Sequence, residues 1–277
     1  MAPSPQRPRI LLRSSRGWIA LAAALVMCAF SHTALAQSVP PPATQNSIDG
    51  NGVDLIRGAL FLSSPSASVG QPGSGGLVYQ RTYDSSIQDW RDNVTGTINS
   101  SGTAFTVTLL GASETFTQSG SNHTSNEGRG GTLTFASNIY TYTTASGVVA
   151  LYDKGLASTQ PTQANEGRVT QMTMPSGERL TFTYTQLSAA PFLAHRLQSV
   201  NNNLGYQLSF QYASNTADAT GLQLIKVTAI NNAIDYCAPT ANGCSGFTRP
   251  WLSLTFGYGS GFQTVTDALG RVMRYAI

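Results

Sequence analysis

Three segments of the chain repeat one pattern around a glycine, and this repeat is the strongest constraint on the fold. The segments are residues 168–184, 196–212 and 261–277, which align without a gap on Gly177, Gly205 and Gly270. The residues three, five and seven places after each glycine are apolar or aromatic, and side chains at that spacing share one face of a β-strand. We expect each glycine in a tight turn that requires positive φ, which glycine adopts with least strain. Each segment is therefore predicted to form a β-hairpin with one buried face.

The repeat also predicts which side chains are buried. Residues 254–258 show the same alternation, but a longer loop precedes them in place of the glycine turn. Arg271 follows the third glycine and completes the last predicted turn. The residues expected in the core of the hairpins are Leu180, Phe182, Tyr184, Leu208, Phe210, Tyr212, Leu254, Phe256, Tyr258, Met273 and Tyr275. Because an isolated hairpin is marginal in water, we expect the hairpins to stack into one repetitive sheet.

The rest of the chain also indicates short strands. The clearest segments are residues 77–83, 104–110, 132–136 and 139–144. They alternate β-branched and aromatic residues with polar ones, which favours strands. No segment after the N-terminal region shows a helical period over three turns. The prediction is an all-β fold of antiparallel hairpins.

Two β regions are expected in this all-β chain. We assign residues 46–160 to an N-terminal β region and residues 161–277 to the repeat hairpins. The last hairpin reaches the final residue with no capping sequence, whereas a terminal repeat normally has an altered, polar edge. We therefore expect this chain to be the N-terminal part of a longer repeat protein, or the product of a truncated reading frame.

The first 36 residues have the order of a secretory signal peptide. Four arginines precede the apolar run 18–30, and the small residues Ala34 and Ala36 flank Leu35 at the expected cleavage site. The apolar run has 13 residues, whereas a membrane-spanning helix needs about 20. Residues 37–45 are rich in proline and are predicted to form a stiff linker. We therefore expect a secreted or extracytoplasmic protein, in the periplasm or at the cell surface, with no membrane association after cleavage.

The positive charge of the chain lies in the predicted signal peptide. The chain has 16 Lys and Arg against 13 Asp and Glu, but four of the arginines fall within the first 36 residues, where no acidic residue occurs. The mature chain keeps 12 basic and 13 acidic residues. Nucleic-acid binding needs clustered positive charge, so no nucleic-acid partner is expected.

Two cysteines, Cys237 and Cys244, remain in the mature chain. The stretch between them contains Pro239, Asn242 and Gly243, which favour turns. In an exported protein, such a pair favours a disulfide that closes a short loop. A zinc site is the weaker alternative, because two cysteines without a nearby histidine supply too few ligands.

The last repeat, residues 265–275, resembles the YD repeat of RHS-type proteins. Gly270, Arg271 and Tyr275 match the Gly-Arg pair and the tyrosine of that motif, and residues 48–83 resemble the region that opens the shell of exported RHS proteins. The resemblance covers roughly residues 46–277, and the Tyr-Asp pair of the motif is absent because Ala276 follows Tyr275.

This resemblance implies a continuous β-sheet wound into a hollow shell. The shell of the family often encloses a variable C-terminal toxin, so the implied partners are the rest of the shell and the enclosed C-terminal polypeptide. The self-cleaving aspartate motif of the family has no match here, so the resemblance implies no catalytic residue.

The residues alone indicate no enzyme. A nucleophilic triad needs a histidine beside a nucleophile and an acid, and His123 and His195 are interpreted as surface histidines. The carboxylates fall mainly at turns, where aspartate is favoured. The segment 49–54 faintly resembles a calcium loop but has Val53 at a ligand position. We therefore predict no enzymatic activity, no metal and no cofactor.

A surface adhesin or a carbohydrate-binding repeat module is the alternative function. Eleven tyrosines and three tryptophans could form a platform for sugar rings, although most tyrosines alternate along strands and are expected to pack. Trp90 is the exposed aromatic that we single out for this role. The partner in this alternative is a cell-surface glycan.

Overall fold

A computed structural model describes residues 48–56, 58–71, 73–158, 165–189 and 192–276. The predicted signal peptide and proline-rich linker lie outside these residues. Residues 47–277 form one unit, separate from residues 1–46. No helix in the described part of the chain is long and apolar enough to cross a membrane.

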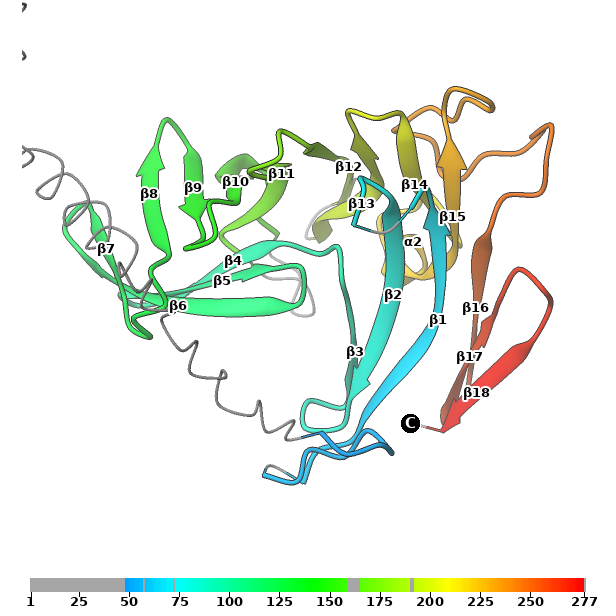
Figure 1. Ribbon diagram of the computed structural model, residues 1–277, viewed down its shortest axis with the longest axis horizontal. Helices are drawn as coiled ribbons and strands as arrows, with labels where there is room; N and C mark the ends of the chain where they lie inside the picture. Colours follow the sequence, from blue (N-terminus) through cyan, green and yellow to red (C-terminus); the bar gives the residue numbers. More distant parts are fainter. Residues whose placement is uncertain (1–47, 57, 72, 159–164, 190–191, 277) are drawn as a thin grey trace, which may run out of the picture. The chain divides into compact units, whose positions relative to one another are not determined.

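The regular elements of the described residues are strands, apart from two short helical turns, which confirms the all-β prediction (Figure 1). The strands are β1 (Phe61–Val69), β2 (Leu77–Asp84), β3 (Asp89–Asp92), β4 (Thr97–Ser101), β5 (Ala104–Leu109), β6 (Ala112–Ser119), β7 (Asn122–Ser125), β8 (Thr132–Ala136), β9 (Ile139–Thr143), β10 (Val149–Asp153), β11 (Gly167–Thr173), β12 (Arg179–Ala189), β13 (Phe192–Asn202), β14 (Tyr206–Tyr212), β15 (Leu224–Asn231), β16 (Ser253–Gly259), β17 (Phe262–Thr266) and β18 (Val272–Ala276). The described residues also contain two short helical turns, η1 (Lys154–Leu156) and α2 (Ala219–Leu222).

Strands β4 to β11 form a closed antiparallel ring. Each strand pairs with the next, and β11 pairs with both β10 and β4. The first half of β11 faces β4, with Gly167 opposite Ile98. Its second half faces β12, with Met172 opposite Leu180. Strand β11 therefore belongs both to the ring and to the sheet that continues from it.

Buried side chains fill the ring, as is usual for a small closed sheet. Phe116 is fully buried, and its ring lies 6.0 Å from that of Tyr142. The carboxylate of Glu114 is buried in the same place, where it accepts hydrogen bonds from the hydroxyls of Tyr142 (2.8 Å) and Ser125 (2.6 Å). These bonds satisfy a polar group that would otherwise be costly to bury.

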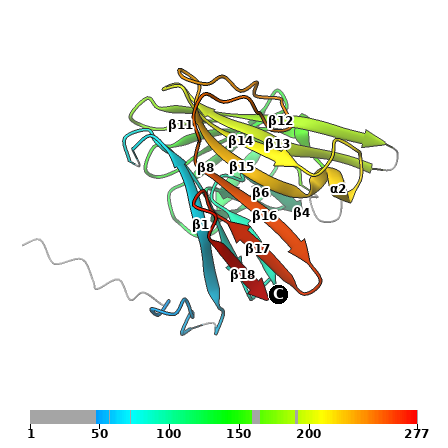
Figure 2. The ribbon, with the colours of Figure 1, turned by 90° about the vertical axis from the view of Figure 1, so that its right-hand side faces the viewer.

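Strands β12 to β18 continue from β11 as an open antiparallel sheet. Strands β1 to β3 form a separate sheet, and β1 and β2 contact β14, β15 and β16 (Figures 1 and 2). The fully buried Tyr79 of β2 packs edge-on against Phe210 of β14 at 5.4 Å and Phe256 of β16 at 6.3 Å. The core of this region therefore lies between two sheets.

The three repeat segments form hairpins in one register. In each, the residue five places before the glycine lies directly opposite the residue three places after it. These pairs are Met172 with Leu180, Val200 with Leu208, and Val265 with Met273. The hairpin of β9 and β10 has the same register around Gly147, with Tyr142 opposite Ala150. One hairpin geometry thus occurs in both the ring and the open sheet.

The turns of these hairpins share their hydrogen bonds as well. The values of φ are +86° at Gly177, +87° at Gly205 and +77° at Gly270. The N–H of each glycine donates to the carbonyl oxygen three residues earlier, at 2.9, 3.3 and 3.0 Å respectively. Positive φ is strained for residues with a Cβ, which explains glycine at this position.

Seven of the residues expected in the hairpin core are buried, namely Leu180, Phe182, Leu208, Phe210, Tyr212, Leu254 and Phe256. Tyr184 and Tyr275 are half-buried and pack against that core.

Two of the expected core residues are exposed, which corrects the sequence prediction. Met273 is 44% exposed and lies in β18, the edge strand that pairs with β17 alone among the described strands. Tyr258 is 38% exposed near the end of β16, where its hydroxyl donates to the carbonyl of Leu224 at 2.7 Å.

Candidate functional site

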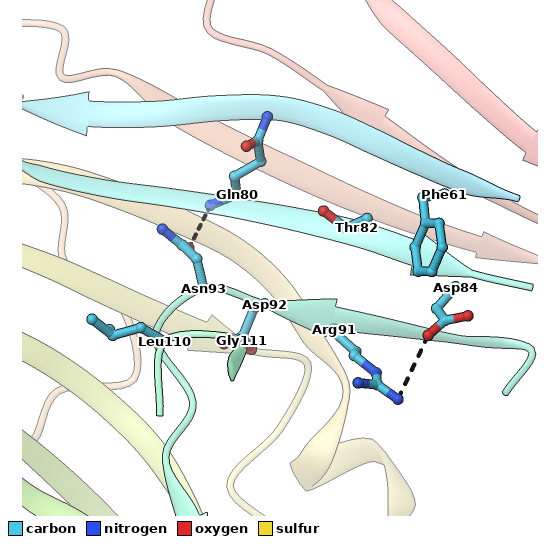
Figure 3. A pocket seen from close by; sticks show the side chains of 9 residues that line it. All are labelled: Phe61, Gln80, Thr82, Asp84, Arg91, Asp92, Asn93, Leu110 and Gly111. Atoms are coloured by element: carbon cyan, nitrogen blue, oxygen red, sulfur yellow. Dashed lines mark hydrogen bonds and ion pairs between the residues drawn. The ribbon is translucent and has the colours of Figure 1, made fainter. Parts of the chain in front are cut away.

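A polar groove lies between β2, β3 and the turn that joins β5 to β6 (Figure 3). Its volume is ≈ 300 Å³. Gln80, Thr82 and Asp84 alternate along β2 and therefore face the same side of the strand. Phe61 of β1 and the turn residue Leu110 complete the apolar part of the wall.

Protein partners hold the polar groups of this groove in place. Asp84 and Arg91 form an ion pair at 3.5 Å at one end, beside Phe61 (Figure 3). At the other end, the Asn93 amide accepts from the backbone N–H of Gln80 (2.9 Å) and donates to the carbonyl of Val78 (2.8 Å). The groove offers carboxylate, guanidinium, amide and hydroxyl groups beside an aromatic ring, which suits a polar ligand.

A second, smaller cavity of ≈ 140 Å³ lies between the two sheets. Arginines from three strands line it, namely Arg81 of β2, Arg168 of β11 and Arg196 of β13. Each guanidinium lies over an aromatic ring: Arg81 over Phe256 (4.5 Å), Arg168 over Tyr184 (5.8 Å) and Arg196 over Tyr212 (4.6 Å). Contact with the ring faces offsets part of the cost of burying these cations.

Burial shifts the pKa values of the tyrosine and arginine side chains at this second cavity. It raises the pKa values of the Tyr184 and Tyr212 hydroxyls well above their ordinary range, against the opposing effect of the arginines. It lowers the pKa of the Arg168 and Arg196 guanidinium groups, but from so high a starting value that both remain charged at neutral pH. The cavity therefore combines fixed positive charge with the neutral phenol of Tyr212, and the neutral phenol of Tyr184 lies beside it, under Arg168.

Arg196 also fixes a neighbouring loop. Its Nη1 donates to the carbonyls of Ser214 (2.6 Å) and Gly221 (2.8 Å), and its Nε donates to Gln198 Oε1 at 3.2 Å. Its Nη2 donates to Asn215 Oδ1 at 2.5 Å. This arginine thus holds the connection between β14 and β15 through neutral acceptors.

Neither histidine is the free surface side chain that the sequence suggested. His195 is 5% exposed, and its Nδ1 lies 3.1 Å from the carbonyl oxygen of Ala157. His123 is half-buried in β7, edge-on to Phe105 at 5.0 Å. Burial lowers the pKa of both imidazoles. The error arose because the partners of these histidines, the backbone carbonyl of Ala157 and the ring of Phe105, are distant in sequence.

Trp90 is not an open aromatic platform. Its ring lies 5.6 Å from that of Tyr83 and 4.8 Å, edge-on, from that of Tyr275. Strand β3 thereby contacts β18, nearly two hundred positions later in the chain. A single sequence gave no signal for this contact, because both partners lie in ordinary alternating strands.

The predicted disulfide is present. Cys237 and Cys244 are bonded, with their Cα atoms 5.8 Å apart. Cys237 is buried, 1% exposed. The bond closes a short loop within the connection from β15 to β16.

The segment resembling a calcium loop forms a turn of the repeat type. The Asp49 carboxylate accepts hydrogen bonds from the N–H groups of Asn51 (2.8 Å) and Val53 (2.9 Å). The Asp267 carboxylate likewise accepts hydrogen bonds from the N–H groups two and four residues later in the chain. The Asn202 amide oxygen accepts from the N–H groups two and four residues after Asn202. Within the described part of the chain, no group of three His, Cys, Asp or Glu side chains is placed to hold a metal ion.

Comparisons with known proteins identify similar structures but no family. No family model matches the chain, and no curated protein matches it. A crystal structure of TcdB2-TccC3 is 14% identical, with a TM-score of 0.47, over 81% of this chain and 16% of that chain. A Tc holotoxin pore of Photorhabdus luminescens is 13% identical, with a TM-score of 0.45, over 78% of this chain and 16% of that chain.

A third similar structure is the N-terminal domain of the effector protein SpvB from Salmonella typhimurium strain LT2. It is 10% identical, with a TM-score of 0.44, over 78% of this chain and 99% of that chain. The chain therefore spans about a sixth of the length of the two Tc toxin chains and nearly all of the SpvB domain.

Proposed function

We propose that this chain is a non-enzymatic wall segment of a secreted β-repeat shell, which encloses or presents a C-terminal toxin or effector polypeptide. The observation that carries the proposal is the recurrence of one hairpin, with one turn and one register, along a continuous sheet. A repeat of this kind extends a surface one unit at a time, and each unit buries its apolar face against neighbours. The resemblance of residues 265–275 to the YD repeat agrees with this role.

The wall acts by excluding other molecules. Backbone ladders between β11 and β18 form a continuous layer, and backbone groups paired in a ladder are unavailable to a protease. The apolar face is covered by β1 and β2 around Tyr79, so the layer is two sheets thick at that point. Such a layer protects a polypeptide behind it without any chemical step.

Protease protection in the natural secreted product tests this function. The natural product and its wall variants are purified from the host, and the intact mass of each is measured. Each protein is then digested with a protease under the same conditions. Leu254→Asp places a charge at a fully buried position, and Thr255→Asp places the same charge at the next, exposed position of β16.

We expect a protease-resistant polypeptide in the natural product and in Thr255→Asp, and its rapid cleavage in Leu254→Asp. A stable secreted product of this chain alone, with nothing protected, would contradict the proposal.

Carbohydrate binding is the second candidate, and the groove of Figure 3 favours it. Amide, hydroxyl and carboxylate groups beside Phe61 could hydrogen-bond to sugar hydroxyls while the ring packs on a sugar face. A glycan array with the natural product tests this candidate, with Arg91→Gln as the groove variant and Arg179→Gln as the surface control. Binding that is lost in the groove variant alone would support an adhesin.

A further inference from the structure

The small cavity between the sheets has an excess of positive charge. Among the described residues, its lining contains three guanidinium groups, from Arg81, Arg168 and Arg196, and one carboxylate, from Asp92. Arg168 and Arg196 are 7% and 2% exposed. Burying several like charges together is costly unless an opposite charge accompanies them.

The Asp92 carboxylate already accepts hydrogen bonds from a neighbouring turn. Asp92 Oδ1 accepts from the N–H groups of Val94 (3.0 Å) and Thr95 (2.6 Å), and its Oδ2 accepts from the Thr95 hydroxyl (2.9 Å). It holds the start of the connection from β3 to β4. Its negative charge lies beside the cavity, but its oxygens are directed to this turn.

Two of the arginines bind neutral partners. Arg81 donates from Nε to the Tyr79 hydroxyl at 2.8 Å and also hydrogen-bonds to the side chain of Tyr258. Arg196 bonds to backbone carbonyls and side-chain amides. Neither takes part in the ion pairs formed within the described residues. The charge of these two groups is therefore not neutralised by direct pairing there.

The cavity has the size for a small ligand. A water molecule occupies about 30 Å³ in the liquid, so ≈ 140 Å³ holds an oxyanion with a few waters. The lining also includes His195 and Thr95, which are further polar contacts. Guanidinium groups match the oxygens of carboxylates and phosphates better than other cations do.

We propose that this cavity is an oxyanion-binding site that accepts a phosphate, a sulfate or the carboxylate of an acidic peptide side chain. The anion would balance the charge of Arg81 and Arg196, whose described hydrogen bonds go to neutral groups, and it would join β2 of the covering sheet to β11 and β13 of the repeat sheet. This inference does not depend on the proposed wall function, because the cavity is formed entirely within this chain.

Calorimetric titration of the secreted protein with inorganic phosphate tests the site, at constant ionic strength with chloride as the reference salt. A second titration with N-acetyl-aspartate distinguishes a peptide carboxylate from a free inorganic anion. The variants are Arg168→Gln and Asp92→Asn, and the control is Arg179→Gln, which removes the same charge at an exposed position.

We expect saturable binding of one anion per chain. Arg168→Gln should weaken anion binding by about tenfold or more, because the variant loses a hydrogen bond between the guanidinium group and the charged anion. Arg179→Gln should leave it unchanged. Binding of phosphate identifies an inorganic anion, and binding of N-acetyl-aspartate alone identifies a peptide carboxylate.

Asp92→Asn keeps the test decisive if Arg168→Gln does not fold. It removes the negative charge and preserves the Oδ1 acceptor for the backbone, so anion affinity should rise by about threefold or more. Absence of binding by both anions overturns the proposal, as does binding that Asp92→Asn weakens or that Arg168→Gln leaves unchanged in a folded variant.

Discussion

The closed ring and the open sheet are built from the same hairpin, yet they bury its apolar face in different ways. In the ring, β11 returns to β4, so every strand has two neighbours and the side chains fill a shared interior. In the open sheet, β18 pairs with β17 alone among the described strands, and the face is buried by a second sheet, β1 to β3. Closure removes a sheet edge, whereas an open sheet needs a cover.

Within the open sheet, the burial of one repeat position shows the effect of this cover. The residue three places after the glycine is Leu180 in β12, Leu208 in β14 and Met273 in β18. It is 8% exposed in β12, fully buried in β14 and 44% exposed in β18. The repeat thus fixes which way the side chain points, and the cover decides whether it is buried.

Truncating one buried aromatic in each region should have the largest effect and would separate the two regions. Tyr79 and Phe116 are both fully buried. Tyr79→Ala and Phe116→Ala should each lower the free energy of unfolding by about 3–5 kcal/mol, measured by denaturant titration. Hydrogen exchange should show lost protection in β14 to β16 for Tyr79→Ala and in β4 to β10 for Phe116→Ala.

Phe135→Ala is the control for these two variants. Because Phe135 is 42% exposed, its truncation should lower the free energy of unfolding only slightly. If both buried variants lose protection at the same amides, the ring and the open sheet unfold as one unit and the distinction between them is wrong.

Removing the disulfide should have the next largest effect, confined to the open sheet. Replacing Cys237 and Cys244 together by serine opens a loop with a sequence separation of 7. Chain entropy in the unfolded state then lowers stability by about 2.5 kcal/mol. Denaturant titration measures this loss, and hydrogen exchange of the ring should not change. Faster exchange in β4 to β10 would show that the loop supports the ring as well.

A side chain at a repeat turn should have a moderate effect. Gly205 has φ of +87°, and a Cβ added there meets open space. Gly205→Val should therefore cost about 1–2 kcal/mol through backbone strain alone, with more for the β-branch. Gly50→Ala is the control, because Gly50 lies in a turn without positive φ and its Cβ would also be free. A melting curve of Gly205→Val that coincides with the wild-type curve would refute the assigned turn.

The smallest effect is expected when low pH protonates Asp267 in the last turn. This prediction compares the exposed β17–β18 turn with the β13–β14 turn, where Asn202 takes the same place. Burial tends to raise the pKa of Asp267, but hydrogen bonds from the side chain and N–H of Arg271 and from the N–H of Leu269 outweigh it and hold that pKa below 3.8. Because the folded pKa is lowered, the carboxylate contributes stability above pH 3.8, and this contribution is lost as pH falls further.

Unfolding measured between pH 6 and pH 2 should show a smaller acid destabilisation in Asp267→Asn than in the wild type. Asn202, at the equivalent position of the β13–β14 turn, makes the same two backbone bonds without a charge, and its Nδ2 also donates to Glu178 Oε1 at 3.2 Å. Asn202→Ala should therefore change the acid dependence less than Asp267→Asn does. An unaltered acid dependence in Asp267→Asn would contradict the assigned role of this carboxylate.

The sequence by itself determined the hairpins. Gly177, Gly205 and Gly270 marked the turns because only positive φ closes them without strain, and the alternation around them set the register through neighbours a few residues apart. The disulfide was predicted for the same reason, since the residues between Cys237 and Cys244 favour a tight loop.

Only the tertiary structure decided what the hairpins pack against. The return of β11 to β4, the cover of Tyr79, the exposure of Met273 and Tyr258, and the burial of His195 all depend on contacts between segments far apart in the chain. Alternation specifies two faces of a strand but not the partner of either face. The arginine cavity has a mixed origin. Arg168 and Arg196 occupy the same position of the repeat, at the start of segments 168–184 and 196–212, but only the tertiary structure brings them together with Arg81 of β2.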